Sequence, residues 1–145
     1  MSKTSEFLDA IDDARVTAAI QSAENRTSCE FRVIVSRRGA PDPVAAATEK
    51  FVDLDMHKTK LRNAVLIYVA PASRTFALYA DTAAHRHVGQ PLVQRLAAEM
   101  GEHFKRGDFT AGLEHVLRVL SESLAQAFPA DASLGNELSD TVVRD

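Results

Sequence analysis

Residues 59–81 read TKLRNAVLIYVAPASRTFALYAD, and the rest of the predicted fold is arranged around them. Its AVLIYVA run at residues 64–70 carries no charge and is rich in β-branched and aromatic residues, which is typical of a strand buried on both faces. Pro71 ends this strand because proline cannot donate to a sheet, and residues 72–74 complete a turn of hairpin length. A second strand is therefore expected over residues 75–80.

The apolar spacing and the turn residues predict the elements on either side of the hairpin. Before the hairpin we expect a helix over about 5–26, broken near Asp12 and Asp13, then a strand at 31–36 (FRVIVS), and then a helix from Pro43 to about Asp55, which Asp42 caps and whose apolar stripe is Val44, Ala47, Phe51 and Leu54. After the hairpin we expect an irregular segment at 82–90 and a helix with Pro91 in its first turn, whose apolar stripe is Leu92, Leu96, Met100 and Phe104. A break at 106–108 separates this helix from a last helix over about 109–127.

This order of elements predicts an α/β fold, a three-layer α/β/α sandwich with a small mixed sheet. Strand, helix, strand implies a parallel crossover, and the tight turn makes the third strand antiparallel to the second. Helices would cover both faces of the sheet. We expect a single domain over residues 1–129 and a disordered tail over residues 130–145, which has little to bury.

Composition excludes several classes of protein. The chain has 145 residues, of which 46% are hydrophobic, enough for one packed core. Its net charge of −3, with both signs interspersed, leaves no electrostatic footprint for nucleic acid or a membrane surface. The N-terminus is acidic and unlike a signal peptide, no apolar run approaches the roughly 20 residues of a membrane span, and the single Cys29 cannot form an internal disulfide. We therefore expect a cytoplasmic protein.

Polar residues flank the open end of the predicted hairpin. If the first two strands are parallel and the third returns, one end of the sheet collects Glu30, Arg62, Asn63 and Asp81, with His85 directly after them and the turn at residues 101–108 near the same rim. Two carboxylates, an arginine and an asparagine can bind a divalent cation through oxygen atoms or hold a phosphate group. This end of the sheet is our predicted site.

Simpler interpretations of the same residues stay open. Glu30 and Arg62 can form an ordinary salt bridge, and Asp81 can act only as a cap of the following loop. Open α/β sheets usually bind ligands at the carboxyl ends of their parallel strands, which here means residues 36–42 and Pro71. We prefer the end of the sheet that collects Glu30, Arg62, Asn63 and Asp81, because polar residues are denser there.

The remaining candidate groups are weaker. His85 and His87 resemble a metal-ligand pair but lack a third ligand at a fixed spacing. His57 and His115 fall on predicted helix surfaces, and Cys29 has no histidine or asparagine at a recognisable spacing, so we expect an inert thiol. The sequence contains no glycine-rich phosphate loop, dinucleotide fingerprint, CxxC pair or G-x-S-x-G elbow.

Four stretches resemble motifs of one family, in the same order along the chain. They are Glu24 with residues 27–33 (TSCEFRV), Thr59 with residues 62–70 (RNAVLIYVA), residues 76–81 (FALYAD), and His103, Phe104, Gly107, Phe109, Gly112 and Leu113. The family is that of TPM domains, also called TPM phosphatase, and the similarity covers about residues 14–129. The chain departs from the family pattern where Cys29 and Ala80 replace glycines and where Ala83 and Ala84 replace Gly-Ile, which removes backbone freedom from a loop that would wrap an ion.

The resemblance implies an α/β/α sandwich of the short soluble bacterial branch. Plant thylakoid members are described as acid phosphatases, and some relatives bind calcium. The first hypothesis is accordingly a metal-assisted phosphatase, in which Glu30 and Asp81 hold Ca²⁺ or Mg²⁺, while Asp81, Arg62 and Asn63 act on a phosphate ester. The alternative is a non-catalytic module that binds a protein partner, with the same residues as a structural ion or salt-bridge site.

Overall fold

The predicted hairpin forms the middle of the structure, a computed structural model that describes residues 2–131 and 142–145. Strand β2 (Val65–Ala70) pairs antiparallel with strand β3 (Thr75–Ala80), and the short 3-10 turn η2 (Pro71–Ser73) joins them. Every residue of β2 is buried, as its uncharged sequence predicts. The hairpin is therefore confirmed almost residue for residue.

Strand β1 (Phe31–Val35) lies parallel to β2, so the predicted mixed sheet is confirmed. The chain passes from β1 to β2 through helix α3 (Pro43–Asp53) and the 3-10 turn η1 (Met56–Lys58). A fourth strand, β4 (Val143–Arg144), pairs parallel with the other edge of β1, which gives the order β3-β2-β1-β4.

Strand β4 was not predicted, because it lies in the segment expected to be disordered. Asp145 holds it in place: its N–H donates to Val35 O at 3.0 Å, and its carboxylate pairs with Lys50 Nζ at 2.9 Å. The disorder prediction is wrong for this end of the tail. Residues 132–141 of the predicted tail lie outside the described residues, and the domain boundary at residue 129 stays a prediction.

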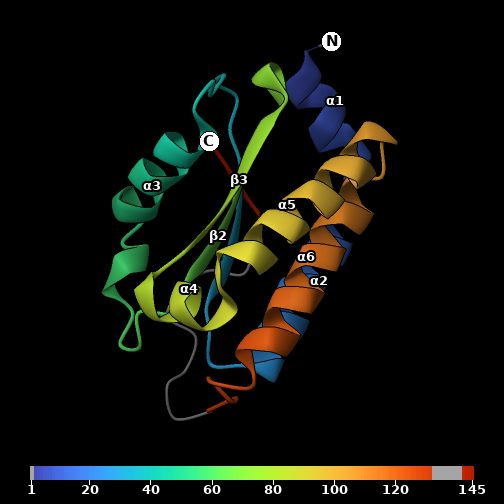
Figure 1. Cartoon of the computed structure of the whole chain (residues 1–145). Helices are drawn as coiled ribbons and strands as arrows, with labels where there is room; N and C mark the ends of the chain where they lie inside the picture. The colour runs from blue at the N-terminus through green and yellow to red at the C-terminus, as the bar shows by residue number, and fades with distance from the viewer. Residues whose placement is uncertain (1, 132–141) are drawn as a thin grey trace.

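Helices cover both faces of the sheet, which confirms the three-layer sandwich (Figure 1). Helix α3 lies on one face. The other face is covered by α1 (Lys3–Ala10), α2 (Asp13–Arg26), α5 (Gln90–Lys105) and α6 (Phe109–Leu124). Side chains of β2 alternate between the two resulting cores, since neighbouring residues of a strand point to opposite faces.

The two cores divide the apolar residues as this alternation requires. On the α3 face, Leu66 and Tyr68 pack with Phe51 of the helix. On the other face, Ile67 packs with the predicted stripe of α6, all of whose members are buried: Leu113, Val116, Leu117, Leu120 and Leu124. The stripe predicted for α3 holds only in part, because Val44 is 59% exposed and the packing of α3 on the sheet begins one turn later, at Ala47.

Two helix starts confirm the capping predictions. The Asp12 carboxylate accepts a hydrogen bond from Arg15 N at 3.1 Å and so caps α2. The Asp42 carboxylate accepts one from Ala45 N at 3.2 Å, and Pro43 follows as the first residue of α3. Each carboxylate satisfies a backbone donor that the first turn of a helix leaves without a partner.

The segment after the hairpin differs from the prediction. Residues 82–90 were expected to be irregular, but α4 (Thr82–Val88) occupies most of them and ends at Gly89, whose φ is 83°. This helix is only two turns long and buries only Ala84 fully, so it lacks the apolar periodicity by which helices are predicted. Among the residues that the structure describes, no helix combines the length and apolar character needed to cross a membrane.

Candidate functional site

The register of the sheet places Glu30, Ala64 and Asp81 in one row across three strands. Val65 N donates to Glu30 O at 2.8 Å, and Asp81 N donates to Ala64 O at 2.9 Å. Because neighbouring strands lie about 4.8 Å apart, the Cα atoms of Glu30 and Asp81 are roughly 10 Å apart. Chain direction therefore brings the predicted residues to one end of the sheet, as expected.

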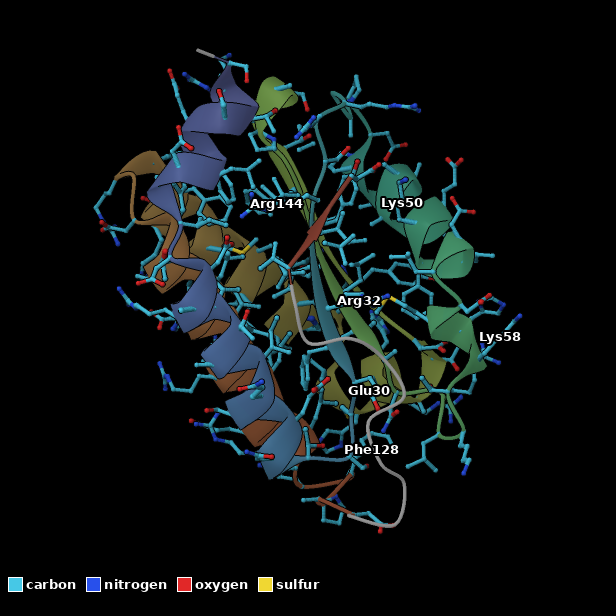
Figure 2. All side chains as sticks on the ribbon, turned by 180° about the vertical axis from the view of Figure 1, so that it is seen from behind. Glu30, Arg32, Lys50, Lys58, Phe128 and Arg144 are labelled. Atoms are coloured by element: carbon cyan, nitrogen blue, oxygen red, sulfur yellow. The ribbon has the colours of Figure 1, made fainter. Side chains whose placement is uncertain are left out.

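We call Glu30, Arg62, Asn63 and Asp81 the polar rim. Glu30, Asn63 and Asp81 are buried, with 4%, 2% and 4% of their surface exposed, whereas half of the Arg62 side chain is exposed. Figure 2 shows Glu30 at the lower end of the sheet, with Lys50 and Arg144 toward the opposite end. The rim is thus mostly buried, and the Arg62 guanidinium lies at its solvent-exposed edge.

Arg62 forms a two-point ion pair with Asp81. Arg62 Nε donates to Asp81 Oδ2 at 2.9 Å and Arg62 Nη2 donates to Oδ1 at 3.2 Å. Thr82 N also donates to Oδ1, at 2.7 Å, so Asp81 is the N-terminal cap of α4 as well. Hydrogen bonding to the Asp81 carboxylate, and then its negative charge, raise the pKa of Arg62.

The Arg62–Asp81 pair ties the loop before β2 to the start of α4. Arg62 has a φ of 53°, a left-handed conformation that is unfavourable for a residue with a side chain. Its backbone is held at both ends, because Arg62 N donates to Thr59 O at 3.3 Å and Ala83 N donates to Arg62 O at 3.1 Å. The ion pair therefore acts as a latch between two segments of the chain.

The thiol of Cys29 lies in the core beside the rim. Burial raises the pKa of Cys29 to about 11, against the opposing effect of hydrogen bonds from Thr27 and Asn63. A thiol with this pKa is almost fully protonated at neutral pH and is a poor nucleophile. The prediction of a buried, inert thiol agrees with this environment.

The donor set of the rim does not fit a resident divalent cation. Ca²⁺ takes six to eight oxygen ligands, but both oxygens of Asp81 already accept hydrogen bonds, and the Arg62 guanidinium would repel a cation. Within residues 2–131 and 142–145, no group of three or more His, Cys, Asp or Glu side chains is placed to hold a metal ion. The role of Glu30 and Asp81 as metal ligands stays a prediction that this geometry does not support.

The histidines after the rim do not converge on a common point. His85 Nε2 lies 2.8 Å from Gln90 Oε1, whereas His87 Nε2 lies 2.8 Å from Ser123 O. Each ring is engaged with a different partner. The two histidines therefore do not form the ligand pair that their spacing suggested.

The turn at residues 101–108 lies at the opposite end of the sheet, so the prediction that it reaches the rim is wrong. A Cβ added to Gly101 would lie 3.3 Å from the ring of Phe76, and the Phe104 ring packs against Phe76 with centroids 5.5 Å apart. Phe76 pairs with Val69, far from the rim along β2.

The alternative site at the carboxyl ends of β1 and β2 is closed by the chain itself. Ala40 N donates to Ser73 Oγ at 2.9 Å, and Thr75 Oγ1 donates to Ala40 O at 2.6 Å. Arg37 N donates to Asp145 O at 3.2 Å from the end of β4. These polar groups satisfy one another, which argues against a ligand at this end.

Sequence reasoning missed a second polar region, on the outer side of the helical layer. A groove of about 400 Å³ runs between α2 and α6 and is lined by Ala19, Ser22, Arg26, His103, Ala111, Glu114, His115 and Arg118. We call it the α2–α6 groove. The sequence analysis placed His115 on a helix surface and gave it no role. The one sequence feature that relates to the groove is Arg118, three residues after His115 on the same face of the helix, and it indicates a polar site only once the packing of the helices is known.

Comparisons with known proteins agree with this architecture. The family model of the TPM domain matches residues 1–123. A protein named BA42 from the psychrophilic bacterium Bizionia argentinensis, solved by NMR, has 32% sequence identity and a TM-score of 0.83, with 92% of each chain covered. No curated protein matches the chain.

A second solved structure is similar in fold alone. It is the N-terminal domain of a protein from P. gingivalis, solved by solution NMR, with 14% identity and a TM-score of 0.63 over 83% of this chain and 81% of that one. At this identity the match supports the arrangement of helices and strands and carries no argument about function.

Proposed function

Since this chain belongs to the TPM domain family, we propose that it is a non-catalytic, protein-binding module of that family in which the polar rim stabilises the fold. One observation carries the proposal: both carboxylate oxygens of Asp81 are bound inside the protein, by Arg62 and by the first N–H of α4. A carboxylate engaged in this way is a cap and an ion-pair partner. Oδ1 accepts two hydrogen bonds and Oδ2 one, so both oxygens already serve the fold.

The chemistry of hydrolysis points the same way. A hydrolase needs a nucleophile or an activated water, together with charge stabilisation at the reacting atoms. At the rim the Cys29 thiol is protonated, and the Arg62 guanidinium is committed to Asp81. Two of the residues predicted to act on a phosphate ester, Arg62 and Asp81, therefore bind each other.

A metal-assisted phosphatase is the second candidate function. One observation favours it: Glu30, Asn63 and Asp81, buried polar side chains from three separate stretches, meet at one end of the sheet. Half of the Arg62 side chain is exposed, so it has room to turn from Asp81 toward a phosphate ester. This candidate requires a divalent cation at Glu30 and Asp81, which the donor set of the rim does not favour.

A turnover assay separates the two candidates. The purified protein is incubated with p-nitrophenyl phosphate, with and without Ca²⁺, Mg²⁺ or Mn²⁺, and compared with Asp81→Asn and with Asp42→Asn. The Asp42 variant is a matched control, because Asp42 also caps a helix and lies outside the rim. We expect all three proteins to show the same background rate.

Turnover that disappears in Asp81→Asn and persists in Asp42→Asn, with both variants folded by circular dichroism, would overturn the proposal in favour of the phosphatase. Calorimetric titration with Ca²⁺ tests the cation separately, and no binding is expected. Location in the cytoplasm and the identity of a protein partner belong to the proposed function and stay predictions.

A further inference from the structure

Helices α2 and α6 run side by side in the same direction, and the groove follows their seam. Asp12 N donates to Thr110 Oγ1 at 3.0 Å near the start of both helices, and Arg26 Nη1 donates to Ser121 Oγ at 3.0 Å near their ends. Three small side chains make the room between them: Ala19, Ser22 and Ala111. None of the rim residues lines this groove, so a ligand of the groove is independent of the function proposed for the rim.

The groove carries more positive than negative charge. Its lining includes two arginines, Arg26 and Arg118, and one carboxylate, Glu114. Glu114 is already paired with Arg15, which approaches from outside the lining. Arg26 donates to the neutral hydroxyl of Ser121, so its charge is not matched by that partner. The lining is therefore arranged to attract an anion.

The second arginine is held by a chain of hydrogen bonds. His115 Nε2 lies 2.9 Å from Glu99 Oε1 and therefore donates to this carboxylate, while Arg118 Nη2 donates to His115 Nδ1 at 3.3 Å. A guanidinium can only donate, so Nδ1 accepts in this contact. The hydrogen bond from His115 lowers the pKa of the Glu99 carboxyl group. Arg118 Nη1 also lies 3.7 Å from Glu122 Oε1, but this exposed pair is loose and leaves the guanidinium accessible.

A second histidine packs beside the first. His103 Nδ1 lies 2.9 Å from Glu99 O, and since a carbonyl can only accept, Nδ1 donates and the ring is held at the edge of the groove. The His103 and His115 rings stack with centroids 5.6 Å apart. Gly112 permits this approach of α5 to α6, since a Cβ there would lie 3.0 Å from His103 Cβ.

We propose that the α2–α6 groove is a binding site for a small oxyanion with two negative charges, held by the guanidinium groups of Arg26 and Arg118. Guanidinium groups match the geometry of carboxylate and phosphate oxygens, and such charge-assisted hydrogen bonds are stronger than neutral ones. The groove volume lies in the range of small-molecule sites, about 300–1,000 Å³, so it admits more than a bare ion. Phosphates and dicarboxylates share this chemistry.

The test is calorimetric titration of the full chain with two probes, inorganic phosphate and succinate, at low ionic strength. At least one probe is expected to bind, and Arg26→Gln and Arg118→Gln are each expected to weaken it about tenfold by removing a charge-assisted hydrogen bond. Arg37→Gln is the matched control, because it removes the same charge from an exposed loop outside the groove. Its affinity should equal that of the wild type.

A variant that fills the groove tests where the anion binds and leaves the charges of the lining unchanged. Ser22→Leu fills the groove and is expected to abolish binding while the protein stays folded by circular dichroism, since Ser22 lines the groove and its side chain is exposed. In NMR spectra the ring protons of His103 and His115 should shift on titration with the probe that binds. No binding of either probe, or equal weakening by Arg37→Gln, would overturn the proposal. A response to phosphate alone or to succinate alone identifies the ligand class.

Discussion

At the polar rim Arg62 faces the carboxylate of Asp81, whereas in the α2–α6 groove Arg26 faces the hydroxyl of Ser121. Both regions bring polar side chains together from distant parts of the chain. At the rim Arg62 and Asp81 neutralise each other, and their pair is structural. In the groove a cation meets a neutral partner, and its charge remains available for a ligand. A high density of polar residues in a sequence therefore indicates where a polar site lies. Whether that site stabilises the fold or binds a ligand depends on how its charges are paired.

The reactivity of Cys29 gives the largest expected effect and tests whether the rim is dry. Burial raises the pKa of this thiol from 9.0 to about 11. At pH 8 the fraction of Cys29 present as thiolate should therefore be roughly a hundredfold lower in the native protein than in the unfolded protein. We expect labelling by iodoacetamide to be slower than that of the urea-unfolded protein by at least this factor. The labelling rate is followed by mass spectrometry.

The pH dependence of labelling serves as the control. Since the thiolate is the reactive form and the native pKa is raised, the native rate should keep rising above pH 9, where the rate of the unfolded protein levels off. Native labelling as fast as that of unfolded protein would show that water and reagent reach the core beside the rim. The distinction between a closed rim and an open groove would then fail.

Asp81→Ala gives the next largest effect, because it removes a helix cap and leaves Arg62 without its partner. We expect the free energy of unfolding to fall by about 2 kcal/mol, measured by urea denaturation. Asp42→Ala is the matched variant, since Asp42 caps α3 and forms no ion pair among the described residues. It should lose only about 1 kcal/mol. Equal losses in the two variants would mean that the Arg62–Asp81 pair contributes nothing to stability.

Local patterns predicted the fold well where one short stretch carried the whole signal. The uncharged AVLIYVA run gave β2, and Asp42 followed by Pro43 gave the start of α3. Helix α4 was missed because a cap at Asp81 sets its start and apolar periodicity plays little part. Strand β4 was missed because two residues are too short to show a period.

For the candidate site, the directions of the strands predicted which residues lie at the same end of the sheet, but not which of them pair. Parallel and antiparallel neighbours place Glu30, Asn63 and Asp81 at one end of any sheet with this order. The pairing of Arg62 with Asp81, and the left-handed backbone of Arg62, had no signal in the sequence. The groove could not be predicted from the sequence, since Arg26 and Arg118 come to line one groove only through the parallel packing of α2 and α6.

The smallest expected effect comes from comparing the two arginines directly. Arg62→Gln should lower the free energy of unfolding, because it leaves the buried Asp81 carboxylate without a cation. Arg26→Gln should change it by less than about 0.5 kcal/mol, because Arg26 is exposed and its partner is the neutral Ser121 hydroxyl, which also donates to Arg118 O. Urea denaturation of both variants beside the wild type measures the difference. If Arg26→Gln destabilised the protein as much as Arg62→Gln, the arginine of the groove would be a structural group like its counterpart at the rim. Its charge would then already be used within the fold, and little of it would be left to bind an anion.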